Sequence, residues 1–140
     1  MSRNHFNELS PCEALIMKLI WEAPQDIPVQ DLIDQLRDDY KKEYARTTVV
    51  TFVGKLKDKR FVDTYRKGKA AFIHPLRTED EYRAQLLKEE ADFWFNGNVF
   101  DMVAAILQSQ EFTEEEVKKI KKIVTILISN IVILKLPDNK

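Results

Sequence analysis

The chain has 140 residues, of which 44% are hydrophobic and 32% charged, with a net charge of −1, three glycines and five prolines. This balance excludes an intrinsically disordered protein and predicts a helix-rich fold of one domain, or of a small domain with an accessory module. The single cysteine, Cys12, excludes an intramolecular disulfide, and no Cys/His cluster has zinc spacing, so no metal and no other cofactor is expected.

No membrane segment is expected either. The first residues lack the apolar run of a signal peptide, and the longest apolar stretch, residues 123–134, is interrupted by polar residues. That stretch is also shorter than the roughly 20 residues that a bilayer requires. We therefore expect a cytoplasmic protein without membrane insertion.

The first predicted helix begins at Ser10-Pro11-Cys12-Glu13. A serine N-cap with a glutamate three residues later is a capping box, and proline is favoured at the first helical position. An apolar stripe of Ile16, Met17, Ile20 and Trp21 follows, and Pro24 ends the helix near Glu22.

A strand of one or two residues is expected at Ile27, followed by a second helix that begins at Pro28 or Val29 and ends about Asp39. Its core stripe comprises Val29, Leu32, Ile33 and Leu36. Residues Tyr40–Tyr44 are expected to form the turn into the next helix.

The stretch Tyr44–Pro75 contains the principal functional signal. Its first half has a helical period, with Val49, Phe52, Val53 and Leu56 on a buried face and Thr47, Thr51, Gly54, Lys55 and Asp58 opposite them, with Thr48 at the edge. Two strand-like runs follow, Phe61–Tyr65 and Ala70–His74, joined by a short turn at Arg66–Lys69. This order predicts a winged helix-turn-helix DNA-binding domain over residues 1–77 of a mostly α protein with a β-hairpin wing.

The charge distribution supports a DNA-binding function. Ten basic and three acidic residues between Lys41 and Lys69 give this window a net charge of about +7 in a chain of net −1. We expect Thr47, Thr48 and Thr51 to meet base edges or nearby phosphates, and Arg46, Lys55, Arg66, Lys67 and Lys69 to contact phosphate chiefly. Gly54 either gives room for close approach to DNA or is merely tolerated by the helix.

Residues 78–140 are predicted to form a helical dimerisation domain. Capping boxes at Thr78–Glu81 and Thr113–Glu116 open helices to about Phe95 and Leu134, and Asn98 caps a shorter helix to Gln108 or Ser109. Three small helices cannot enclose their own apolar surface, so a second copy of the chain is the expected partner. The residues expected at that contact are Phe93, Met102, Ile106, Ile120, Ile123, Val124, Leu127 and Ile131.

Three motifs carry a family resemblance: L-S-P-C-E-A-L-I-M-K-L-I-W at Leu9–Trp21, R-T-T-V-V-T at Arg46–Thr51, and G-K-A-A-F-I-H-P-L at Gly68–Leu76. Together they resemble the penicillinase/methicillin-resistance repressors (BlaI/MecI/CopY family) over about residues 9–125. The resemblance implies a homodimeric winged-helix transcriptional repressor that binds double-stranded operator DNA of dyad symmetry.

Two departures from the family bear on regulation. Copper-responsive members carry a C-terminal cysteine cluster, which the end of this chain, Lys-Leu-Pro-Asp-Asn-Lys, lacks. In β-lactam-responsive members a sensor peptidase leads to cleavage at an Asn-Phe bond, and the corresponding pair here is Ala105-Ile106. A regulatory peptidase is therefore not an expected partner.

Other function classes find less support. The two histidines, His5 and His74, lie far apart in the sequence, and there is no Gly-rich phosphate loop, nucleophile elbow or His-x-x-x-His pair, so no enzyme is expected. The alternative is a winged-helix protein-interaction module that does not bind specific DNA. Such a module would display large apolar residues on its third helix, where this chain has threonines, a glycine and a lysine.

Overall fold

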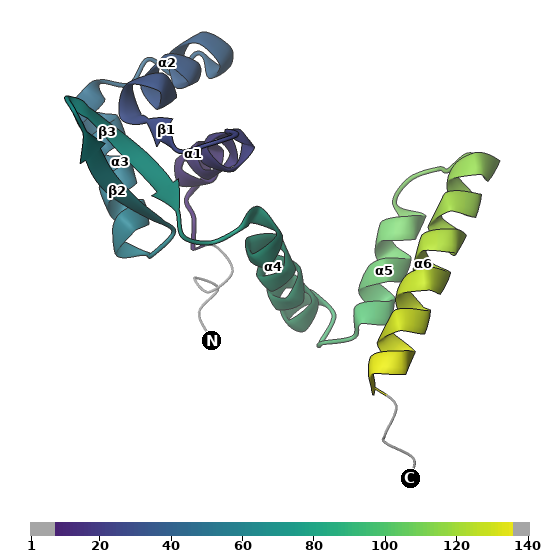
Figure 1. Ribbon diagram of the computed structural model, residues 1–140. Coiled ribbons are helices and arrows are strands. Elements are labelled where there is room, and N and C mark those ends of the chain that lie inside the picture. Colours follow the sequence, from purple (N-terminus) through teal and green to yellow (C-terminus); the bar gives the residue numbers. More distant parts are fainter. Residues whose placement is uncertain (1–7, 136–140) are drawn as a thin grey trace. The chain divides into compact units, whose positions relative to one another are not determined.

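The computed structural model describes residues 8–135, and the side chains up to residue 132 (Figure 1). His5 and the chain end after Lys135 lie outside this part. The described chain divides into two compact units, Met1–Gly97 and Asn98–Lys140. The first contains α1 (Pro11–Glu22), β1 (Ile27–Pro28), α2 (Val29–Tyr40), α3 (Arg46–Asp58), β2 (Val62–Lys67), β3 (Ala70–Pro75) and α4 (Glu79–Trp94). The second contains α5 (Val99–Gln108) and α6 (Glu114–Lys135).

The predicted helix starts are confirmed by their caps. The Ser10 hydroxyl accepts a hydrogen bond from the Glu13 amide at 3.2 Å, and the Glu13 carboxylate accepts one from the Ser10 amide at 2.8 Å. Thr78 with Glu81 and Thr113 with Glu116 form the same reciprocal pair. Because each box joins residues only three apart, it can be recognised without tertiary information.

The three strands form one antiparallel sheet in the order β1-β3-β2, in which Ile27 pairs with Ile73 and Tyr65 with Phe72. The predicted four-residue turn at Arg66–Lys69 is wrong. Arg66 and Lys67 continue β2, because Lys67 still pairs with Ala70, and only Gly68 and Lys69 form the turn. Gly68 has φ +65°, which a two-residue hairpin turn needs and glycine adopts without strain.

The core of the first unit lies between α1, α2, α3 and the sheet. Its buried apolar residues are Leu9, Ile16, Met17, Leu19, Ile20, Ile27, Val29, Leu32, Leu36, Val49, Val53, Leu56, Phe61, Val62 and Ile73. Phe61 precedes β2 instead of opening it. Its amide donates to the Leu56 carbonyl at 2.9 Å and its carbonyl accepts from the Leu76 amide at 2.8 Å, which connects the end of α3 to the end of β3.

Helix α4 belongs to the first unit, where it packs against Trp21 of α1 and against Phe61. The Tyr82 ring lies 5.8 Å from the Trp21 ring and 5.5 Å from the Phe61 ring, measured between centroids. The contacts therefore divide the chain at Gly97, where Asn96 and Gly97 adopt positive φ values of 52° and 80° and end α4.

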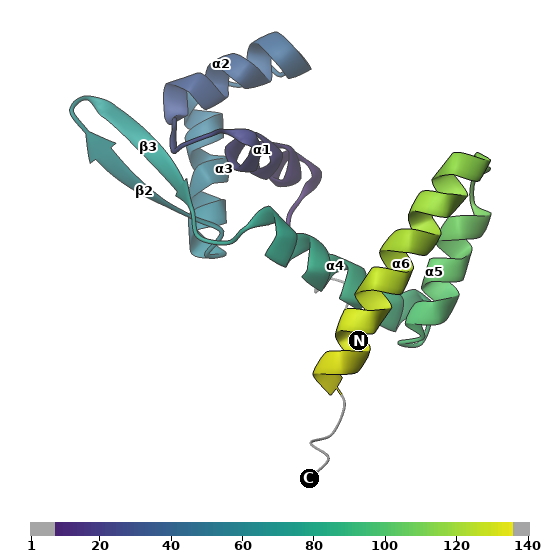
Figure 2. The same cartoon turned by 45° about the vertical axis from the view of Figure 1, so that its right-hand side comes forward.

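Helices α5 and α6 lie side by side as a helical hairpin, as Figures 1 and 2 show. Most of their apolar side chains are exposed in the single chain, and Phe100 is 86% exposed. Among the apolar residues of α5 that recur with a helical period, only Met102 is half-buried, and Val99, Val103, Ile106 and Leu107 are exposed. Two helices have no second layer within this unit to cover them.

Candidate nucleic-acid interface

The outer face of α3 consists of small polar side chains. Thr47, Thr51, Gly54 and Lys55 are all exposed. The Thr51 hydroxyl donates to the Thr47 carbonyl at 2.9 Å, so its oxygen remains available as an acceptor. Ala45, the N-cap, supplies no side-chain acceptor, so no side chain caps the first amides of α3. Uncapped amides at a helix N-terminus favour an anion such as phosphate.

The exposed face is rotated slightly from the predicted one. Thr48 is half-buried, whereas Val50, which the sequence pattern did not single out, is 50% exposed. The two residues flank the face on opposite sides of the helix, so periodicity ranks them equally. The exposure of Val50 places two methyl groups beside Thr47 and Gly54 on a surface that is otherwise polar.

Arg46 is held by α2. Its Nη1 donates to the Gln30 side-chain oxygen at 3.0 Å, and the Gln30 amide nitrogen donates to Asp34 at 2.9 Å. The second bond orients the Gln30 amide so that its oxygen faces Arg46. Gln30 was missed from sequence because it lies 16 residues away, and no pattern joins the two helices at that separation.

The wing presents Arg66 and Lys67 from β2 and Lys69 from the turn, and all three are exposed. Its two strands are braced by the Tyr65 and Phe72 rings, which stack at 5.5 Å with an interplanar angle of 11°. Asp26 accepts a hydrogen bond from the Tyr65 hydroxyl at 2.7 Å and pairs with His74 Nδ1 at 2.9 Å. These bonds, that to His74 first, lower the pKa of Asp26, and the anionic Asp26 ties both wing strands to the loop before β1.

Only part of the basic window is available to a ligand. Lys57 lies 3.8 Å from Asp63, and Lys59 pairs with Glu13 at 2.7 Å. Within the part of the chain that the structure describes, by contrast, Lys55, Arg66, Lys67 and Lys69 have no ion-pair partner. Both α3 and the wing therefore keep exposed cations that no acidic side chain of the described residues neutralises.

The predicted dimerisation residues fall in both units. Phe93 belongs to α4, where its ring contacts that of Trp94 at 4.8 Å. The other seven belong to α5 and α6, with Met102 and Ile120 half-buried and the rest exposed: Ile106, Ile123, Val124, Leu127 and Ile131.

Metal and membrane sites are not found among the described residues. Residues 8–135 contain no group of three or more His, Cys, Asp and Glu that could hold a metal ion. Within the same range no helix is both long and apolar enough to cross a membrane. The Cys12 thiol lies 3.4 Å from the Tyr44 hydroxyl, which it contacts within the first unit.

Comparison with known proteins identifies a family match. No curated protein matches the sequence significantly. Solved structures that align include FabT of Streptococcus pneumoniae in complex with DNA (21% identity, TM-score 0.45, 96% of this chain and 82% of that one). They also include the adhesin competence repressor AdcR of Streptococcus pyogenes (16% identity, TM-score 0.43, 92% and 85%). The penicillinase repressor profile matches residues 9–126, most of the sequence, and the chain therefore belongs to the penicillinase repressor family.

Proposed function

We propose that this DNA-binding repressor acts as a homodimer on an inverted-repeat operator, with α3 in the major groove and the β2–β3 wing along the phosphate backbone. The observation that carries the proposal is that α3 exposes small polar side chains and that four exposed cations of α3 and the wing have no ion-pair partner within the described chain: Lys55, Arg66, Lys67 and Lys69. A major groove about 12 Å wide admits a helix with small outer side chains.

The site residues divide by chemistry. Thr47 and Thr51 are suited to base edges through hydroxyl oxygen and methyl groups, and the Val50 methyls suit the C5-methyl of thymine. Thr48, half-buried, has less surface to offer. Arg46 and Lys55 on α3, with Arg66, Lys67 and Lys69 on the wing, are suited to phosphate.

Dimerisation is supported by the exposed apolar surface of α5 and α6. Monomeric soluble proteins rarely leave contiguous apolar patches of more than a few hundred Å² in water. A second copy buries such a patch most simply, since the same residues then face each other across a two-fold axis. Two DNA-binding units joined in this way read two half-sites, which raises affinity by about 10²–10⁴ although each unit binds DNA as before.

The proposal does not include release of the repressor from DNA by cleavage at the bond that is cut in β-lactam-responsive members of the family. The Ala105-Ile106 bond lies inside α5, and the two residues replace the Asn-Phe pair. Co-expression with an induced β-lactam sensor of the family should leave the repressor intact, as measured by intact mass. A fragment ending near residue 105 would show instead that the repressor is cleaved in response to the sensor.

The test is selection of bound sites from genomic DNA, followed by two matched variants. Thr51→Ala should weaken operator binding by about 1–3 kcal/mol while leaving non-specific DNA almost unaffected. Lys69→Ala should weaken both kinds of DNA alike and reduce the salt slope by about 0.9 for each phosphate that the variant no longer neutralises. If no sequence is enriched and neither variant changes binding, the rival interaction module is the better description.

A further inference from the structure

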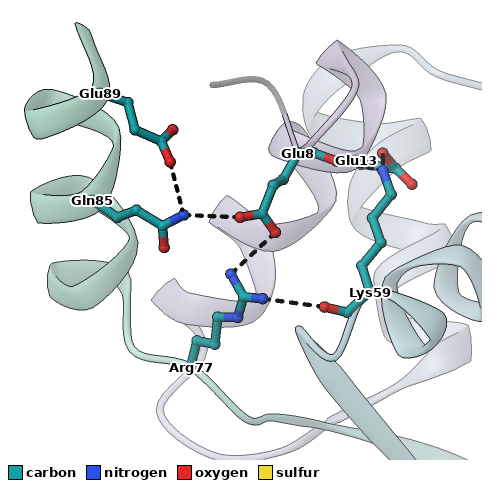
Figure 3. Close-up of polar contacts among 6 residues, drawn as sticks. All are labelled: Glu8, Glu13, Lys59, Arg77, Gln85 and Glu89. Atoms are coloured by element: carbon teal, nitrogen blue, oxygen red, sulfur yellow. Dashed lines mark hydrogen bonds and ion pairs between the residues drawn. The ribbon is translucent and has the colours of Figure 1, made fainter. Parts of the chain in front are cut away.

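Arg77, which joins β3 to α4, makes contacts to four other parts of the first unit, and Figure 3 shows two of them, those with Glu8 and Lys59. Its guanidinium lies 4.0 Å from the centroid of the Phe61 ring. Nη1 donates to the Glu8 carboxylate at 3.3 Å, and Nη2 donates to the Lys59 carbonyl at the end of α3 at 3.2 Å. Its own carbonyl accepts from the Trp21 indole at 2.8 Å. Arg77 therefore touches α1, the end of α3, the start of the wing and the segment before α1.

The same neighbourhood holds the first two turns of α4. Gln85 donates to the second oxygen of Glu8 at 2.9 Å, so Glu8 bridges Arg77 and α4. Lys18 of α1 pairs with Glu79 at 2.9 Å. Together with the Tyr82 ring between Trp21 and Phe61, these contacts dock α4 on the unit that carries α3 and the wing.

We infer that Arg77 is a positioning residue: it locks α4 to the DNA-binding unit and thereby sets which half-site spacing the dimer accepts. The inference rests on the proposed function, since it concerns two DNA-binding units joined through the second unit of each chain. Arg77 itself touches no residue of the proposed DNA surface.

Spacing selectivity depends on the number of joints, by which we mean flexible connections between the DNA-binding unit and the second unit. While α4 is docked, the only irregular chain between the DNA-binding unit and α5 is Phe95–Asn98, which connects α4 to α5. Releasing α4 would add a second joint at residues 77–78. One base pair of extra spacing moves a half-site about 3.4 Å along the duplex and turns it by about 35°. A unit with one joint follows this displacement less readily than a unit with two, and a looser tether also lowers the effective concentration of the second unit.

The experiment compares Arg77→Met with Arg83→Met in the full chain. Arg83 lies in α4, six residues after Arg77, and its ion pair is with Asp80 of the same helix, so both variants lose one positive charge. Affinity is measured for inverted repeats of the selected half-site with the spacer changed in steps of one base pair, and for an isolated half-site. Solvent exchange of the Trp21 indole proton reports whether the backbone at residue 77 stays docked.

For wild type and Arg83→Met we expect one preferred spacing, with affinity falling at least about tenfold for a two-base-pair change, the loss of a large part of the avidity. For Arg77→Met the ratio of the affinities at the preferred spacing and at the spacing changed by two base pairs should shrink by a factor of about three or more. The affinity for the isolated half-site should not change. The Trp21 indole proton should exchange faster than in wild type. A variant that is merely destabilised would lose affinity at every spacing and keep the ratio.

If Arg77→Met does not fold, the surface double variant Lys18→Ala with Gln85→Ala removes two ties and leaves Arg77 packed. It should flatten the spacing profile in the same direction. A profile as sharp as that of wild type in the variants that fold overturns the inference and leaves the proposed function standing. A wild-type protein that binds the repeat no better than one half-site overturns both.

Discussion

Replacing Gly54 with alanine should raise the stability of the protein and lower its affinity for operator. Gly54 lies on the exposed face of α3, and a Cβ added there would meet no side chain or neighbouring element within 4 Å. The free protein thus accommodates the methyl group without strain. Glycine costs about 0.5–1 kcal/mol relative to alanine inside a helix, so the free energy of unfolding should rise by about that amount.

The DNA complex should respond in the opposite sense. If Gly54 allows the α3 backbone to approach the floor of the groove, the added methyl occupies space that DNA would fill. Forcing an extra carbon into a well-packed contact costs about 1–3 kcal/mol, which corresponds to a loss of roughly 5- to 150-fold in operator affinity. Non-specific binding, which depends on phosphate contacts, should change little.

Two assays separate these effects. Thermal unfolding should shift upward by about 2–8 °C for a unit of this size. Titration of selected operator and of unrelated DNA at one salt concentration gives the specific and non-specific affinities. A variant that is more stable and binds operator as tightly as wild type would refute close approach at Gly54 and show that the helix merely tolerates a glycine there.

Three further results are expected. Lys59→Met leaves the buried carboxylate of Glu13 without its cation, and urea unfolding should show a loss of about 1–3 kcal/mol; a fully exposed pair would show almost none. Burial raises the pKa of Glu13, but hydrogen bonds from Lys59 and Ser10 and the Lys59 charge outweigh it and lower the pKa. The stability that Glu13 contributes is therefore fully present above the unfolded-state pKa of about 4.5 and is lost as the pH falls through the lower folded-state pKa. Ile123→Glu should convert a dimer to a monomer in sedimentation and lower operator affinity by about 10²–10⁴, and a dimeric variant would contradict the proposed interface. Gln30→Ala frees Arg46 and should weaken operator binding by up to about 1.5 kcal/mol, whereas unchanged affinity would mean that Arg46 needs no support from α2.

The local structure of this protein could be predicted from its sequence because it depends on interactions between residues that are close together in the chain. The capping boxes at Ser10, Thr78 and Thr113 join residues three apart, and the periods of the apolar residues separate helices from strands. The motifs and the basic window led in the same way to the family and to α3 and the wing as the candidate surface. The error in the wing turn concerned two residues, Arg66 and Lys67. It arose because the length of the β2–β3 pairing is known only from the observed partners, such as Lys67 with Ala70.

Tertiary structure decided what the sequence pattern does not encode. Lys57 and Lys59 count toward the basic window, yet Lys59 is used by Glu13, 46 residues earlier in the chain. The docking of α4 depends on contacts such as that of Trp21 with the Arg77 carbonyl, 56 residues apart. Periodicity shows which face of an element is apolar and leaves open which element covers it, since burial is a property of the packed whole. The sequence therefore identified the candidate DNA surface, and only packing showed which of its cations pair within the described chain and how the surface is joined to α4.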